Sequence, residues 1–123
     1  MSKYIAVKGA TLKLSAGTAT QKEITSTPSS HSKIEGNGIY NGTINVQISG
    51  YSGSTVATQT GGGLGSINGT ASKVKVDGNP VVLKGDQSNN ILITGNYANG
   101  NPGAREIITV SIDDPGQDLW KAE

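Results

Sequence analysis

Short stretches in which apolar and polar residues alternate recur along this chain, and turn residues separate them. In the clearest stretch, within 39–50, Ile44, Val46 and Ile48 alternate with three polar residues. Strict alternation is the pattern of a β-strand with one buried and one solvated face. The same reasoning predicts strands at 4–7, 11–15, 33–35, both arms of 69–86, 91–94 and 107–112, with a final edge at 119–121.

Glycine or an Asn-Gly pair interrupts the pattern about every ten residues, so no helix is predicted. In the segment 69–86, Asp77-Gly78 supplies the positive φ angles of a two-residue hairpin turn. The segments 17–32, 50–65 and 96–103 are predicted to be loops, the first with a weakly extended alternative. The run Gly61–Gly63 marks either a flexible tip or a close approach of two backbones.

A weak internal repeat links two parts of the chain. Residues 32–39 resemble 72–74 followed by 77–81, after a slip of two residues. Both contain Ser-Lys, an aliphatic residue, an acidic residue and Gly-Asn. A Gly-rich chain produces such short matches by chance, so duplication and coincidence both remain open at this point.

Composition indicates a single all-β domain over 1–123, built from short antiparallel hairpins and Gly-rich loops. The chain has 123 residues, 18 of them Gly, and one third of its residues are apolar. This apolar share is low for a wide core, so a flat or tapering β-structure fits better.

Charge and cysteine content exclude several functions. The net charge of +1 provides no electrostatic footprint for nucleic acid. The absence of Cys excludes disulfides and thiolate metal ligands. The first residues form a strand pattern and not a signal peptide, so we expect synthesis in the cytosol.

No motif predicts catalysis, and we expect a protein that is not an enzyme and has no cofactor. The glycines of 61–65 are not followed by the Lys-Ser/Thr of a phosphate-binding loop. Asp113 and Asp114 belong to a turn that ends in Pro-Gly. His31 is the one weak metal candidate, and a single imidazole cannot complete a zinc site.

Regular apolar faces are the candidate partner-binding surface, with core packing as the alternative role for the same residues. Trp120, near the end of the chain, is a candidate hydrophobic anchor. The candidate residues are Ile44, Val46, Ile48, Val74, Val76, Ile108, Val110 and Trp120.

Three segments resemble PAAR-like proteins, the pointed tips of contractile injection machines such as type VI secretion systems and phage-tail-like particles. Residues 69–86 resemble the hairpin Lys-Val-x-Val-x-Gly-x-Pro-Val of that group. Residues 11–18 resemble the opening segment of one branch. Residues 102–105, Pro-Gly-Ala-Arg, differ by one letter from the motif that names the group.

The resemblance implies a compact, cone-like domain that caps a trimeric β-helical spike and helps to pierce a target envelope. It implies assembly into an injection particle that is delivered outside the cell, transient membrane contact and an effector as a possible second partner. Metal-bearing members use several His, often with Cys, whereas this chain has one His and no Cys. It therefore resembles members without metal, or its tip is held without one.

Two other functions fit the same pattern. A self-assembling phage tail or capsid decoration protein would associate through symmetric contacts. A surface- or carbohydrate-binding β-module would need a platform of exposed aromatic residues, for which the chain offers Tyr4, Tyr40, Tyr51, Tyr97 and Trp120.

Overall fold

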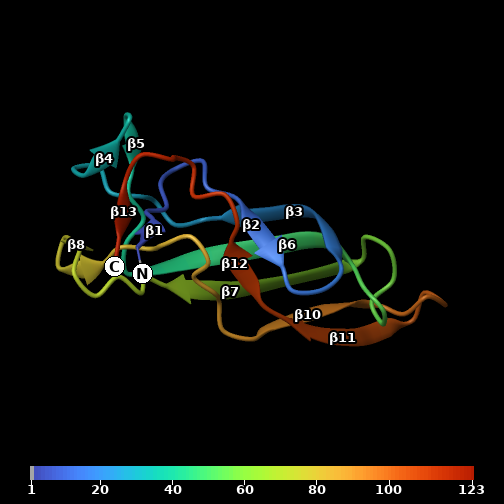
Figure 1. Ribbon diagram of the computed structural model, residues 1–123. Coiled ribbons are helices and arrows are strands. Elements are labelled where there is room, and N and C mark those ends of the chain that lie inside the picture. The colour runs from blue at the N-terminus through green and yellow to red at the C-terminus, as the bar shows by residue number, and fades with distance from the viewer. Residues whose placement is uncertain (1) are drawn as a thin grey trace.

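The computed structural model describes residues 2–123, and the prediction of an all-β fold is confirmed (Figure 1). Within this range the chain forms thirteen strands and no helix, and therefore no helix that could cross a membrane. The strands are β1 Lys3–Tyr4, β2 Leu12–Leu14, β3 Thr18–Ile24, β4 Lys33–Ile34, β5 Asn37–Gly38, β6 Thr43–Ser52, β7 Gly61–Asn68, β8 Lys75–Val76, β9 Asn79–Pro80, β10 Ile91–Asn96, β11 Pro102–Ile108, β12 Val110–Ile112 and β13 Lys121–Ala122.

A five-stranded antiparallel sheet with the order β11-β10-β7-β6-β3 forms the body of the molecule. Its longest strand, β6, has the predicted alternation, because Ile44, Val46 and Ile48 are all buried. Their neighbours in sequence point to the other face, which is open to solvent. The sheet therefore has one inner and one outer face.

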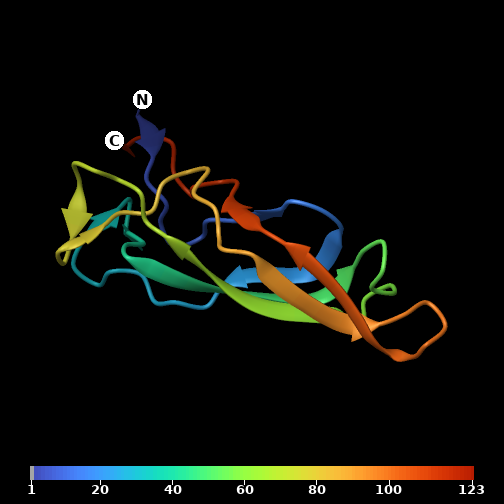
Figure 2. The same cartoon turned by 90° about the horizontal axis from the view of Figure 1, so that it is seen from below.

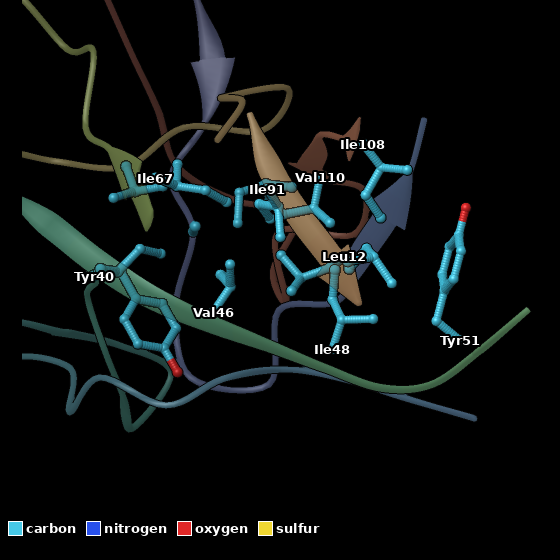
Figure 3. Close-up of a cluster of buried hydrophobic side chains, with 14 of the residues drawn as sticks. Leu12, Tyr40, Val46, Ile48, Tyr51, Ile67, Ile91, Ile108 and Val110 are labelled. Carbon is cyan, nitrogen blue, oxygen red and sulfur yellow. The ribbon is translucent and has the colours of Figure 1, made fainter. Parts of the chain in front are cut away.

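The two-stranded pair β2–β12 covers the inner face, and together the two layers enclose the main core (Figure 3). Leu12 of β2 and Val110 of β12 lie against Ile48 and Ile91 of the large sheet. Burial of such aliphatic side chains contributes about 1.5–3 kcal/mol each. The low apolar content of the chain is thus concentrated between these layers.

The predicted loop over 50–65 is confirmed only for 53–60, because 50–52 end β6 and 61–65 begin β7. The glycine-rich run is a central strand, and it lacks side chains on its inner face because Ile91 and Ile93 of β10 occupy that space. A Cβ at Gly65 would lie 2.4 Å from Cγ1 of Ile91, and one at Gly63 would lie 2.6 Å from the carbonyl oxygen of Leu92. Of the two interpretations of the glycine run, close backbone approach is the correct one.

Two more segments are strands where loops were predicted. Residues 18–24 of the first polar segment form β3, an edge strand that pairs with β6, so the extended alternative is the correct one there. Strand β11 begins at Pro102, inside the predicted loop 96–103, and pairs with β10. Both strands lie at sheet edges, where one side of the strand faces water and the apolar periodicity is weak.

The short strand pairs β4–β5, β8–β9 and β13–β1 gather at one end of the long dimension of the molecule (Figures 1 and 2). A second apolar cluster lies among them and is separate from the main core. The loop between β10 and β11 lies at the opposite end.

Candidate functional site

Three strand pairs with the same register form one end of the molecule. In each pair a lysine begins the first strand and lies opposite the second residue of the other strand. The paired residues are Lys33 with Gly38, Lys75 with Pro80 and Lys121 with Tyr4, followed by Ile34 with Asn37, Val76 with Asn79 and Ala122 with Lys3. The end is therefore built from three copies of one small unit.

Two of the units are continuous hairpins with matching turns. Glu35-Gly36 and Asp77-Gly78 have φ angles of 52° and 83°, and of 53° and 80°. Positive φ at both central residues defines the type I′ turn, whose twist suits a two-residue hairpin. The hairpin predicted at Asp77-Gly78 is confirmed, and a second hairpin of the same kind follows Ile34.

The third unit is assembled from the first and last strands of the sequence. Strand β13 takes the place of β4 and β8, and strand β1 takes the place of β5 and β9. Glu123 then corresponds to Glu35 and Asp77, and Ser2 corresponds to the turn glycines. The Ser2 hydroxyl donates a hydrogen bond to the Glu123 carboxylate across this gap, at 3.4 Å.

The three segments that follow these pairs, 5–7, 39–41 and 81–83, are joined in a closed ring. Each central residue donates its N–H to the central carbonyl of another segment. The bonds run from Ala6 to Val82 at 2.8 Å, from Val82 to Tyr40 at 2.9 Å and from Tyr40 to Ala6 at 3.0 Å. Such a cycle of equivalent bonds is the signature of pseudo-threefold symmetry.

Two further sets of backbone hydrogen bonds obey the same symmetry. In the first set, the first residue of each ring segment donates to the residue before its own strand pair. In the second set, the residue that follows each ring segment donates to the next strand pair. The first set is Ile5 to Trp120, Ile39 to Ser32 and Val81 to Val74; the second is Lys8 to Gly38, Gly42 to Pro80 and Lys84 to Tyr4. We call the strand pairs and the ring together the threefold end.

This symmetry explains the internal repeat and corrects its alignment. Residues 33–41 correspond to 75–83 without any slip, at an offset of 42 residues. The lysine that matches Lys33 is therefore Lys75, and Lys73 lies outside the repeat. Lys73 instead forms an ion pair with Glu123, with 3.1 Å between Nζ and Oε2.

Side chains of the threefold end alternate between the two cores. Equivalent positions of the strand pairs contribute Ile34, Val76 and Ala122 to the second cluster, and ring positions contribute Ile39, Val81 and Ile5. The central ring residues Ala6, Tyr40 and Val82 belong to the main core instead. The ring thus lies between the two clusters and links the strand pairs to the sheet.

A buried glutamine holds the third unit together in place of a turn. The Gln117 amide nitrogen donates to the carbonyl oxygens of Ile5 and Trp120, at 2.9 and 2.7 Å. Its oxygen accepts from the N–H groups of Leu119 and Trp120, at 2.7 and 2.8 Å. All of its hydrogen-bonding capacity is used to fix the segment that leads into β13.

The third unit also has a hollow of 340 Å³ beside it, lined by Ser2, Lys3, Tyr4, Lys84, Gly85 and Lys121. Nζ of Lys121 lies 4.7 Å from the centre of the Tyr4 ring, a cation–π contact. Lys84 also lines a neighbouring hollow that contains Glu35, Asp114 and Asp118. Together the two hollows are lined by lysines and carboxylates, and these side chains match no catalytic arrangement considered above.

The sequence-predicted partner residues divide into two groups. Six of them are core residues: Ile44, Val46, Ile48, Val76, Ile108 and Val110. Two are exposed, Val74 at 36% and Trp120 at 61%. Val74 and Trp120 lie in equivalent positions of the threefold end, where their carbonyl groups bind Val81 and Ile5, and Ser32 is the third member of the set.

Other candidates from the sequence have local roles. The N–H of His31 donates to the Ser29 hydroxyl at 3.1 Å, within a polar loop. Among residues 2–123, no group of three or more His, Cys, Asp or Glu side chains is placed to hold a metal ion. Tyr40 and Tyr51 are buried, so they cannot contribute to an aromatic platform for sugars.

A half-buried network around Glu106 was not predicted from the sequence. Its carboxylate accepts from the N–H groups of Thr55 and Val56, at 2.6 and 2.8 Å, and from the Tyr51 hydroxyl at 2.8 Å. Burial acts to raise the pKa of Glu106, but these hydrogen bonds outweigh it, so the pKa lies below its usual value. Burial and the neighbouring Glu106 raise the pKa of Tyr51 to about 12.

The network fixes the 53–56 loop to the sheet. Both carboxylate oxygens of Glu106 accept hydrogen bonds within the protein, so its role is structural. Asp86 has a similar role at the threefold end, where it accepts from the Leu83 N–H at 2.8 Å and from the backbone and hydroxyl of Thr70. Nothing in the sequence around Glu106 or Asp86 indicates which distant N–H and hydroxyl groups these carboxylates bind.

Comparison with known proteins identifies no relative. No family model, curated protein or solved structure matches this chain. The function is therefore inferred from the geometry of the threefold end.

Proposed function

We propose that this chain is a non-enzymatic cap that binds, as one copy, to the end of a trimeric partner. The observation that supports the proposal is the closed ring of hydrogen bonds among Ala6, Tyr40 and Val82. A single chain without internal symmetry can fit only one protomer of a trimer well. Three equivalent units allow one chain to offer a similar surface to all three protomers.

The partner that fits best is a β-rich trimer, such as the β-helical spike of a contractile injection apparatus. The last strands of such a spike leave N–H and C=O groups unpaired, and a β-structured cap can cover them. The resemblance of residues 69–86 to PAAR-like tips leads to the same proposal, because these residues include the β8–β9 unit. In that setting the protein would travel with the injection particle, contact the target membrane briefly and serve as a place for an effector.

Stoichiometry tests the proposal directly. The tagged chain is recovered from its native cells, and the intact complex is weighed by native mass spectrometry. We expect one copy of this chain with three copies of one larger partner. A homo-oligomer of this chain without a partner would favour the self-assembling tail or capsid alternative, and an equimolar complex would also contradict the proposal.

Matched variants then locate the surface. Asn37→Glu and Asn79→Glu change equivalent positions of two units, and Thr94→Glu places the same charge on the outer face of the sheet. We expect the double variant Asn37→Glu/Asn79→Glu to lose the complex and Thr94→Glu to retain it. Equal loss of the complex in the double variant and in Thr94→Glu would show that the threefold end is not the docking surface.

A further inference from the structure

Strand β11 is an open edge of the five-stranded sheet. It pairs with β10 on one side, and among residues 2–123 no strand pairs with its other side. Within residues 2–123, none of the backbone hydrogen bonds outside the strand pairs involves 102–108. Such an edge carries a row of N–H and C=O groups that can pair with a further strand.

The other edge of the sheet is less suited to pairing. Strand β3 pairs with β6 in one continuous register, from Thr18 opposite Ser52 to Ile24 opposite Val46, and it carries the adjacent exposed charges of Lys22 and Glu23. Charges along an edge strand discourage strand addition. In β11 only Arg105 presents an exposed charge, because the Glu106 carboxylate is bound to the 53–56 loop.

Exposed aliphatic side chains lead up to the β11 edge on the outer face. Ile107 lies opposite Leu92, and the register of Thr94 with Gly62, carried two residues along, places Leu92 beside Leu64. Their exposed fractions are 67%, 47% and 74%. Adjacent large apolar side chains this exposed mark an interaction surface, and this row ends at the open edge.

The next row on the same face ends at Arg105, which lies opposite Thr94. Arg105 is exposed and is two residues from Ile107, so both side chains stand beside any strand added to β11. Glu106, between them, points to the inner face, where its carboxylate binds the 53–56 loop. The edge therefore presents one cation and one aliphatic group on its outer face.

This charge argues against a second copy of the chain as the occupant. The register of β11 with β10 shifts at Gly95/Asn96, so the regular part of β11 is 104–108. Two such strands paired antiparallel over 104–108 are centred on Glu106, which places the two Glu106 residues directly opposite each other and each Arg105 opposite the other copy's Ile107. Like charges directly opposite each other destabilise a sheet, and Arg105 has no acidic partner in this arrangement.

We propose that β11 accepts an extended segment of a partner protein as a sixth strand, with an acidic residue beside Arg105 and an aliphatic residue two positions away beside Ile107. Main-chain pairing would supply affinity, and the two side-chain positions would supply specificity, as in other cases of strand addition. The proposal is independent of the proposed function, since β11 belongs to the sheet and not to the threefold end.

Two synthetic heptapeptides test the proposal with the intact chain. One alternates threonine and serine around a glutamate and an isoleucine two positions apart, and the other has lysine in place of the glutamate. Amide chemical shifts of the ¹⁵N-labelled protein are followed up to millimolar peptide. We expect shifts concentrated in 102–108 and binding of the glutamate peptide about fivefold tighter than of the lysine peptide.

The variant Arg105→Glu provides a charge swap. Because Arg105 is exposed, this variant is expected to fold, and it should prefer the lysine peptide. The absence of shifts in 102–108, equal binding of both peptides, or an unchanged preference in Arg105→Glu would overturn the proposal. A concentration-dependent dimer of the unmodified chain that pairs through β11 would also overturn it.

Discussion

Closing the third unit of the threefold end covalently should stabilise the protein. Ala122 and Lys3 lie opposite each other as Ile34 and Asn37 do, and a two-residue turn joins the latter pair. With Met1 removed, a peptide bond from Glu123 to residue 2 gives a turn of the same length. The change Ser2→Gly then supplies the glycine found at Gly36 and Gly78.

The expected gain follows from the loss of entropy in the unfolded chain. Linking the two ends of a chain of this length removes a loop-closure entropy worth about 5 kcal/mol in the chain-entropy model. The folded state needs little adjustment, because the strands are already paired in the register that a type I′ turn requires. Strain at the junction lowers the gain, so we expect about 3–5 kcal/mol.

Urea denaturation followed by far-UV circular dichroism measures this difference between the cyclic and linear chains. A second cyclic chain with one additional glycine in the turn is the control, since it closes the same loop without the two-residue geometry. The direct junction should be the more stable of the two by about 1 kcal/mol. If the longer turn is equally stable, or if neither chain exceeds the linear form, the equivalence of the third unit to the two hairpins is refuted.

Three other changes test individual contacts. Gly63→Ala brings a Cβ within 2.6 Å of the Leu92 carbonyl oxygen and should lower the unfolding free energy by about 2–3 kcal/mol. Gly62→Ala, on the opposite face, should change it by less than about 1 kcal/mol, and equal losses of the two variants in thermal melts would contradict this. Glu106→Gln should lower the unfolding free energy by about 2 kcal/mol at neutral pH. Because the folded pKa of Glu106 is lowered, the difference between the two proteins should be complete above the ordinary glutamate pKa and disappear as pH falls through the folded value. Urea titrations from pH 7 to pH 3 measure this difference. Gln117→Ala should open the β1–β13 pair, so that amide hydrogen exchange there rises by at least about tenfold while exchange in β6 stays unchanged.

The sequence predicts those parts of the fold in which local signals agree with the tertiary structure. The alternation of Ile44, Val46 and Ile48 predicts β6 because one face of that strand packs on the core. The Asp77-Gly78 pair predicts the β8–β9 hairpin because few other residues adopt two consecutive positive φ angles. Both features are decided within a few neighbouring residues.

Strand β7 could not be predicted in this way. Its first three inner positions are Gly61, Gly63 and Gly65, which lower strand propensity. The reason for them lies about thirty residues further on, in the side chains of Ile91 and Ile93. The Glu106 network has the same character, since its donors come from the distant loop at Thr55 and Val56. In both cases the cause is a contact that local sequence does not contain.

The threefold end was hidden for a different reason. Two of its units form a repeat that sequence comparison detects, but the third is divided between the two ends of the sequence, so no linear search can align it. Only the pairing of β1 with β13 brings Lys121-Ala122-Glu123 into line with Lys33-Ile34-Glu35. The residues that best support a function were therefore recognisable only as a set, after folding.

The side chains of the ring show where the symmetry is maintained. The central positions, which face the main core, hold Ala6, Tyr40 and Val82, three residues of very different size. The first ring positions, which belong to the second cluster, hold the similar side chains Ile5, Ile39 and Val81, whereas the third positions hold Val7, Asn41 and Leu83. A core without threefold symmetry requires different volumes at the central positions. Backbone equivalence survives beneath these differences, as the three ring bonds of 2.8–3.0 Å show. Similar residues at the first ring positions and dissimilar ones at the central positions are what a cap needs if its end must match a trimer while its body need not.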